Sequence, residues 1–167
     1  FETDLGGARC LILWGMNPGA SSLPSMHGYW DLCHDGMKTI VVDPRYSETA
    51  AKADLWLPLR PGSDAALALA MLNTIIMERL YDKDFVATWC DGFEELKEHV
   101  KPYTARWAAP ITWLSADQIK QAARLYAKNT PGCIQWGCTW DQLGRSSTTA
   151  SHALTLIRAV CGNLEVP

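Results

Sequence analysis

The chain has 167 residues, of which 48% are hydrophobic, and a formal net charge of −3. This length and composition predict one globular domain with a sizeable core. The chain is neither basic enough to indicate nucleic-acid binding nor repetitive enough to indicate a repeat array. Its longest apolar segment, residues 65–77, is interrupted by Asn73 and Thr74 and is too short to span a bilayer, so it predicts a buried helix.

The sequence contains six cysteines, and no two of them form a CxxC pair. A chain large enough to build its own core does not require disulfides, so the thiols are expected to be free and in apolar surroundings. Their spacing is not that of a metal site. The cysteines expected in the core are Cys10, Cys33, Cys90, Cys133 and Cys161.

The two ends of the sequence predict that it is one piece of a longer, multidomain chain. It begins at Phe1 rather than at a methionine, and Pro167 follows directly on a predicted helix end. Chemistry that is missing from residues 1–167 is therefore expected elsewhere in the parent chain.

The first part of the chain alternates between strands and helices. Residues 10–15 (CLILWG) and 38–43 (KTIVVD) predict buried strands, with a short helix over 25–36 between them. A strand, a helix and a strand at this spacing predict a parallel crossover. Residues 54–59 predict a third short strand, which leads through a Pro-Gly-Ser turn into a long apolar helix over 64–80.

The second part of the chain is mostly helical. Residues 82–128 predict more polar helices, one of which begins with a capping box from Ser115 to Gln118. Residues 132–137 (GCIQWG) predict a further strand, and a last helix ends at Gly162. This order predicts an α/β fold, with a doubly wound, mainly parallel sheet in a Rossmann-like three-layer arrangement with additional helices.

Polar loops follow the predicted strands, at the edge where such sheets bind ligands. Asp43 ends the second strand, where nucleotide-binding folds place an acid that accepts from ribose hydroxyls, and Arg45 adds a planar donor group suited to phosphate or guanine. A turn that only caps the strand is the alternative interpretation. The first loop lacks the G-x-G-x-x-G pattern of an ordinary NAD site. The stretch with Gly15, Asn17, Pro18 and Gly19 could still bring backbone amides close to a diphosphate at a helix start.

Four segments in this order resemble the molybdopterin oxidoreductases of the dimethyl sulfoxide reductase and formate dehydrogenase superfamily. They are LWGMNPGAS, VVDPRYSETAAKADLWLPLRPGSDAALALA, LYDKDFVATWCDGFEELKEHVKPYT and WGCTWDQ. The resemblance covers almost the whole chain, and the block from Asp-Pro-Arg to Pro-Gly-Ser-Asp is its most specific part. It implies that residues 1–167 are an interior α/β domain that holds the guanosine diphosphate tails of molybdopterin guanine dinucleotide.

Carried over onto matching positions, the resemblance implies nine cofactor-binding residues: Met16, Asn17, Asp43, Arg45, Gly62, Asp64, Gly137, Cys138 and Gln142. Met16 and Asn17 match the diphosphate loop, and Asp43 and Arg45 match the Asp-Pro-Arg motif. Gly62 and Asp64 match the positions that meet guanine or ribose, and Gln142 matches a glutamine near the pterin and metal. The stretch from Cys138 to Asp141 departs from the family pattern. The resemblance places no catalytic residue and no metal ligand in this segment.

The resemblance further implies a parent enzyme that carries molybdenum or tungsten, with an iron–sulfur cluster as an option elsewhere in the chain. Expected partners are the remaining domains of the same polypeptide, an iron–sulfur electron-transfer subunit and a membrane anchor subunit, as in anaerobic respiration. No binding to nucleic acid and no direct membrane insertion are expected. The fragment alone is expected to be inactive. The substrate and the compartment, cytoplasmic or periplasmic, stay open.

Two alternatives to this function stay open on the sequence alone. The first is a relative of the domain that has lost the cofactor and serves as a scaffold inside a redox complex; the polar loops disfavour it. The second is a generic nucleotide-binding domain for NAD or thiamine diphosphate, which the fold favours and the missing glycine pattern disfavours.

Overall fold

The computed structural model describes residues 5–137 and 147–164. Its centre is a four-stranded parallel sheet in the order β3-β2-β1-β4. The strands are β1 (Cys10–Trp14), β2 (Lys38–Val42), β3 (Leu55–Leu57) and β4 (Gly132–Trp136). The predicted α/β class with a parallel sheet is therefore confirmed.

The strands form where apolar residues run without interruption. All five residues of β1 are buried, which is expected of a parallel strand covered on both faces. In the register of the sheet, Trp14 pairs with Val42 on one side and with Trp136 on the other. The carboxyl ends of β1, β2 and β4 are therefore level with one another, and the loops that follow them meet at one edge.

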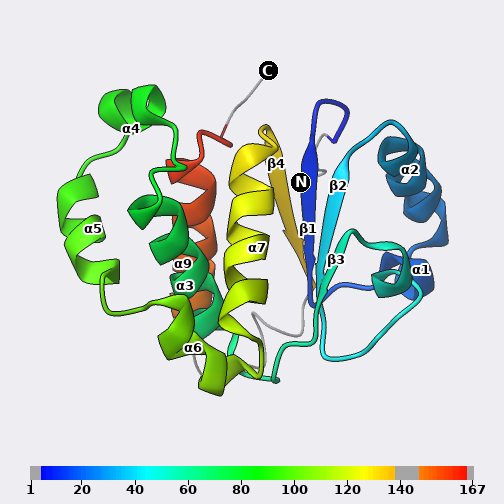
Figure 1. Cartoon of the computed structure of the whole chain (residues 1–167). Coiled ribbons are helices and arrows are strands. Elements are labelled where there is room, and N and C mark those ends of the chain that lie inside the picture. The colour runs from blue at the N-terminus through cyan, green and yellow to red at the C-terminus, as the bar shows by residue number, and fades with distance from the viewer. Residues whose placement is uncertain (1–4, 138–146, 165–167) are drawn as a thin grey trace.

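Helices cover both faces of the sheet (Figure 1). On one face lie α3 (Asp64–Met77), α7 (Ala116–Lys128) and α9 (Ser147–Val160), and on the other lie the short α1 (Pro18–Ser21) and α2 (Leu23–His34). Three helices extend the first layer outwards: α4 (Lys83–Trp89), α5 (Phe93–Val100) and α6 (Ala105–Thr112). A 3₁₀ turn, η1 (Ala50–Lys52), precedes β3.

Alternate residues of the central strands enter two separate cores. Ile12 and Ile40 belong to the large core under α3, α7 and α9, whereas Leu11, Leu13 and Val41 belong to the smaller core under α2. This division follows from the two-residue period of a strand, which directs successive side chains to opposite faces. The central part of the sheet is thus held from both sides, so its loop-bearing edge rests on a rigid base.

Several element boundaries differ from the prediction. Strand β3 has three residues rather than six, and Pro58, which follows it, has no N–H to continue a ladder. Helix α3 ends at Met77 rather than at Leu80, and Arg79 takes a left-handed conformation with φ of 57°. The capping box from Ser115 to Gln118 is present as predicted.

The cysteines in the described residues are free thiols, as predicted. Cys10, Cys133 and Cys161 are buried, whereas Cys33 and Cys90 are half-buried. Within residues 5–137 and 147–164, no cluster of His, Cys, Asp and Glu side chains could hold a metal ion. Over the same residues, no helix has the length and apolarity needed to cross a membrane.

Candidate functional site

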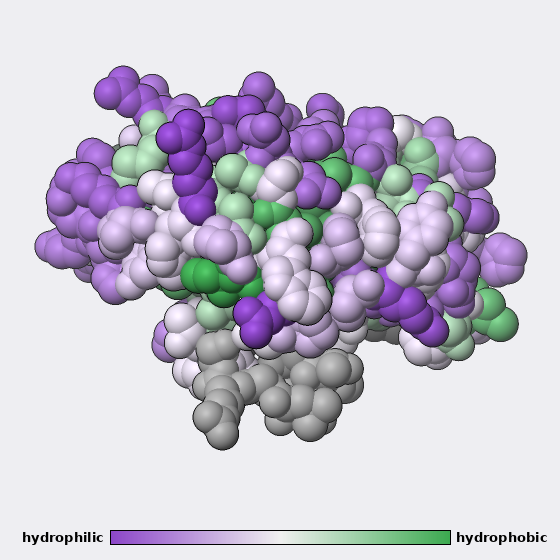
Figure 2. All heavy atoms as spheres, turned by 60° about the horizontal axis from the view of Figure 1, so that its bottom comes forward, coloured by the Kyte–Doolittle hydropathy of each residue, from purple (hydrophilic) through white to green (hydrophobic). Residues whose placement is uncertain are grey.

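The loops after β1, β2 and β3, together with Gly137 after β4, lie at the carboxyl edge of the sheet, at the bottom of Figure 1. Because the strands are parallel and in register, the residues after β1, β2, β3 and β4 all leave from this edge. Figure 2 turns the edge towards the viewer and shows hydrophilic and intermediate side chains around small apolar patches. Ligands of doubly wound folds bind at such an edge.

Close backbone packing joins the loops after β1 and β4. Gly15 has φ of 59°, and its N–H donates to the carbonyl of Val42 over 2.8 Å. The N–H of Gly137 donates to the carbonyl of Trp14 over 3.0 Å. A Cβ atom at Gly137 would lie 2.2 Å from the carbonyl oxygen of Gly15, closer than any real contact. Gly137, a predicted cofactor residue, thus has a packing reason to be glycine.

A side-chain bridge joins the loops after β1 and β2. The hydroxyl of Thr49, which is 1% exposed, donates to Oδ1 of Asn17 over 2.5 Å and accepts from the N–H of Gly19 over 3.2 Å. Nδ2 of Asn17 faces Oε1 of Glu48 at 3.4 Å. Asn17 is therefore held by two residues of the Asp-Pro-Arg loop.

Two backbone amides of the first loop are already used within the protein. The N–H of Gly15 donates to Val42 and that of Gly19 donates to Thr49, so both already have an acceptor within the protein. Pro18 has no N–H, and α1 is only four residues long. In this conformation Gly15 and Gly19 therefore do not offer their amides to a diphosphate, while binding of a diphosphate by this loop stays a prediction. The side chain of Asn17 remains as a donor in this loop.

Asp43 makes the hydrogen bond that a strand cap predicts. Its Oδ1 accepts from the backbone N–H of Arg45 over 2.8 Å, and the indole of Trp56 donates to its carbonyl oxygen over 2.9 Å. These bonds fix the turn and orient the carboxylate at the strand end. They leave Oδ2 without a bond to any described residue, so a structural role and a ligand-binding role are compatible.

Arg45 lies on the surface beside Glu48. Its guanidinium is exposed, as the cap interpretation also predicts. Hydrogen bonds from the backbone amide of Glu48 itself and from the Asn17 side chain, together with the charge of Arg45, lower the pKa of Glu48. This loop therefore presents the carboxylate of Glu48 beside the amide of Asn17, and the cation of Arg45 interacts with that carboxylate.

Asp64 opens α3 and is bonded to the end of β1. The buried indole of Trp14 donates from Nε1 to Oδ1 of Asp64 over 2.8 Å. The turn before the helix is closed by Ser63, whose hydroxyl donates to the carbonyl of Arg60 over 2.7 Å. Gly62 has φ of 80° in this turn, and a Cβ there would meet no atom within 4 Å. The space beside Gly62 is thus open.

The structure brings three predicted residues to the same edge. Asn17 follows β1, Asp43 follows β2, and Asp64 follows β3 while its carboxylate reaches back to β1. Met16 is half-buried and packs against the smaller core. Cys138 and Gln142 lie outside the described residues.

Sequence reasoning missed the residues that orient these side chains. Trp14, Thr49 and Glu48 are not among the residues that the sequence predicted to bind the cofactor. Thr49 and Glu48 lie within the same SET stretch that follows Arg45, so the motif itself was the available signal. Their partner Asn17 lies about thirty residues away, and no local pattern identifies it.

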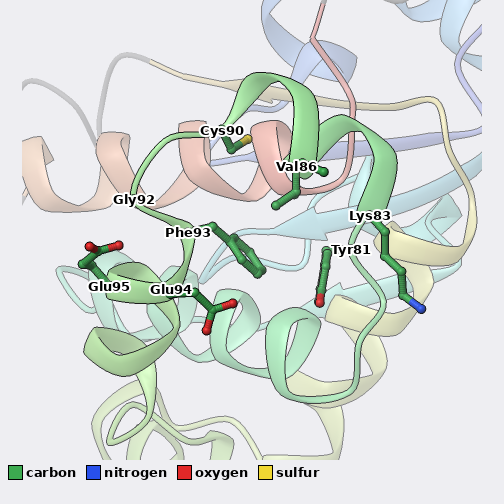
Figure 3. Close-up of a pocket in the computed structure, with 9 residues that line it drawn as sticks. Tyr81, Lys83, Val86, Cys90, Gly92, Phe93, Glu94 and Glu95 are labelled. Atoms are coloured by element: carbon green, nitrogen blue, oxygen red, sulfur yellow. The ribbon is translucent and has the colours of Figure 1, made fainter.

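A separate pocket lies away from this edge, between α4 and α5 (Figure 3). Its volume is about 660 Å³, and its apolar wall includes Tyr81 and Phe93, whose ring centroids are 4.8 Å apart. Lys83, Glu94 and Glu95 contribute its polar wall. It contains none of the residues predicted to bind the cofactor, so it is not the predicted site.

The fold and the loop residues at its edge define a known class of protein. The chain belongs to the molybdopterin oxidoreductase family, which matches residues 2–158. This confirms the resemblance to the dimethyl sulfoxide reductase and formate dehydrogenase superfamily, whose members are among its relatives.

Comparison with individual members of the family gives the degree of similarity. It is 48% identical over 128 residues to acetylene hydratase of Syntrophotalea acetylenica, covering 77% of the chain and 17% of that protein. It is 40% identical over 164 residues to formate dehydrogenase H of Escherichia coli, covering 98% of the chain and 23% of that protein. The match to the solved structure of acetylene hydratase from Pelobacter acetylenicus has a TM-score of 0.91 and 39% identity. It covers 97% of this chain and 22% of the acetylene hydratase chain. The chain thus spans about a fifth of the length of these relatives.

Proposed function

We propose that residues 1–167 form the part of a molybdenum- or tungsten-dependent oxidoreductase that binds the guanosine diphosphate portions of molybdopterin guanine dinucleotide. The observation that carries this proposal is the convergence of Asn17, Asp43 and Asp64 at one sheet edge, on three different loops. Membership of the molybdopterin oxidoreductase family supports the identity of the ligand.

The residues at the edge fit the chemistry of such a ligand. Guanosine diphosphate offers donors on guanine and ribose and acceptors on its phosphates, so a matching site needs carboxylates and N–H donors together. Asp43 and Asp64 are acceptors at the strand ends, and Arg45 and Asn17 are donors. The turn at Gly62 leaves open space for close approach of a ring or a sugar.

The bound cofactor supplies the redox chemistry through its metal, and the protein supplies binding and orientation. In this role Asp43 and Asp64 accept hydrogen bonds from guanine or ribose, and Arg45 and Asn17 donate to phosphate oxygens. The Trp14 and Thr49 side chains hold two of these groups in place. The domain therefore fixes the position of the cofactor relative to the rest of the enzyme.

The isolated segment is proposed to be inactive, because it provides one wall of a site that other domains complete. Each hydrogen bond lost from a charged group costs roughly 1.5 to 3 kcal/mol, so cofactor binding by the segment alone is expected to be weak. The remaining domains of the polypeptide, an iron–sulfur electron-transfer subunit and a membrane anchor subunit stay proposed partners.

A second candidate activity has its own support. A match by sequence and a match by structure both carry the name acetylene hydratase, and the sequence match is 48% identical over 128 residues. Addition of water to an alkyne needs no net electron transfer. An assay of the full-length protein with acetylene and no added electron acceptor separates this activity from oxidation of formate, which requires an acceptor.

The proposed cofactor is tested by analysis of the full-length protein purified without oxygen. We expect molybdenum or tungsten by elemental analysis, and guanine nucleotide in the supernatant after denaturation. Finding neither metal and no guanine nucleotide would contradict the proposal and favour the scaffold alternative.

A further inference from the structure

The side chain of Asn17 sits in a network that fixes the direction of its amide. Thr49 approaches Asn17 Oδ1 to 2.5 Å, and Glu48 Oε1 lies 3.4 Å from Nδ2. Thr49 is buried, and Gly19 packs so closely that a Cβ there would lie 2.8 Å from Cγ of Glu48. Thr49 therefore has little room to rearrange, whereas Glu48 is exposed.

The contacts of the Asn17 amide favour one orientation over the other. A hydroxyl has a single hydrogen, and Thr49 directs it to Asn17 while it accepts from the N–H of Gly19. A carboxylate can only accept, so the atom of Asn17 that faces Glu48 must be the nitrogen. In the flipped orientation the amide oxygen would face the carboxylate oxygen with no hydrogen between them.

We propose that Thr49 is a positioning residue that turns the amide of Asn17 so that it donates to an anionic oxygen of the ligand. This inference rests on the proposed function, in which the ligand oxygen belongs to the diphosphate of the dinucleotide. The amide has two N–H hydrogens, and Glu48 takes at most one of them over a long distance. The other serves the diphosphate, and the backbone amides of Gly15 and Gly19 do not replace it because they already donate within the protein.

The test uses the full-length protein isolated with its cofactor and measures how fast guanine nucleotide is released during incubation at a fixed temperature. Thr49→Val removes the hydroxyl and keeps the shape, whereas Thr49→Ser keeps the hydroxyl. We expect T49V to speed release by about tenfold or more, as loss of a hydrogen bond to a charged group implies, and T49S to stay within about threefold of the wild type. The melting temperature of each variant is measured in parallel.

A double-mutant cycle shows whether Thr49 acts through Asn17. We expect Asn17→Ala to speed release, and T49V to add no further effect in the N17A background. If N17A leaves release unchanged, the proposed function of Asn17 is wrong. If N17A speeds release but T49V does not, or if T49V has the same effect with and without Asn17, the positioning role is wrong. A lower melting temperature with unchanged release would likewise show a structural role alone.

The direction of the amide is tested independently by Asn17→Asp, in case T49V does not fold. A carboxylate at this position has no N–H to donate, so we expect release at least as fast as in N17A. Release at the wild-type rate in N17D would overturn the proposal, because it would show that an acceptor serves as well as a donor.

Discussion

The indole of Trp14 donates a hydrogen bond to the carboxylate of Asp64 over 2.8 Å, although the two residues are 50 positions apart in the chain. Trp14 is the last residue of β1 and is fully buried, and Asp64 is the first residue of α3. The bond therefore fixes the start of a long core helix against the end of the central strand. It also orients Asp64, one of the three side chains that we propose for cofactor binding.

Replacement of Trp14 by Phe is expected to destabilise the protein by about 1 to 3 kcal/mol, because it leaves Asp64 without its donor and removes buried ring volume. Asp64→Asn is the matched control, since its amide oxygen still accepts from the indole. We expect D64N to keep most of the thermal stability and to lose guanine nucleotide. Equal melting temperatures for W14F and the wild type would contradict the structural part of this account.

Two glycines at the edge are expected to respond differently to Ala. Gly137→Ala places a methyl group 2.2 Å from the carbonyl oxygen of Gly15, so the loops after β1 and β4 must separate. Gly62→Ala meets no atom and costs only the left-handed conformation, about 1 to 2 kcal/mol. Thermal unfolding of both variants should show the larger loss for G137A. The reverse order would mean that the two loops do not pack as described.

The two interpretations of Asp43 are separated by Asp43→Asn. The amide oxygen of Asn still accepts from the backbone N–H of Arg45, so a residue that only caps the strand tolerates the change. If Asp43 binds the nucleotide, D43N should lower guanine occupancy by an amount that corresponds to about 1 to 3 kcal/mol. Guanine nucleotide per polypeptide is the measurement.

Asp54→Asn provides the control for D43N. Asp54 bonds Lys38 and the N–H of Thr39 at the opposite end of β2, so it is distant from the proposed site. We expect D54N to lower stability and to leave guanine occupancy unchanged. If D43N binds as much guanine nucleotide as the wild type, Asp43 only caps the strand.

Stability should fall as the pH rises from 9 towards 12. Burial raises the pKa of the Cys10 and Cys161 thiols from 9.0 to about 12, with smaller contributions from neighbouring charges. Between pH 9 and pH 12 the unfolded chain releases thiol protons that the folded chain keeps. The contribution of these thiols to the free energy of unfolding is therefore complete below pH 9 and is lost as the pH rises through 12. Burial raises the pKa of Tyr126 as well, which acts in the same direction.

The urea midpoint measured at several alkaline pH values checks this prediction. Cys161→Ala removes one of the titrating groups, so its midpoint should decline less steeply with pH than that of the wild type. Parallel declines for the two proteins would show that Cys161 does not keep its proton in the folded state.

The sequence was sufficient to predict those features that depend on neighbouring residues. Apolar runs predicted β1 and β2, and the Ser115 to Gln118 pattern predicted the start of α7. The end of α3 was misplaced because residues up to Leu80 continue an apolar pattern, while the left-handed backbone at Arg79 ends the helix.

The orienting contacts of the site could not be predicted in the same way. Thr49 meets Asn17, and Trp14 meets Asp64, only because parallel strands bring distant loops to one edge. The use of the Gly15 and Gly19 amides within the protein depends on the same tertiary contacts. The motif thus predicted which residues face the ligand, and the fold was needed to show which of their atoms already bond within the protein.

The most direct test of the account is an experimental structure of the full-length protein isolated anaerobically with its cofactor. We predict guanosine diphosphate density at the carboxyl edge of the sheet, with Nδ2 of Asn17 within hydrogen-bond distance of a phosphate oxygen and with Asp43 and Asp64 facing guanine or ribose. Cofactor density at a different edge, or density that leaves all three side chains in contact with protein alone, would contradict the assignment of this domain.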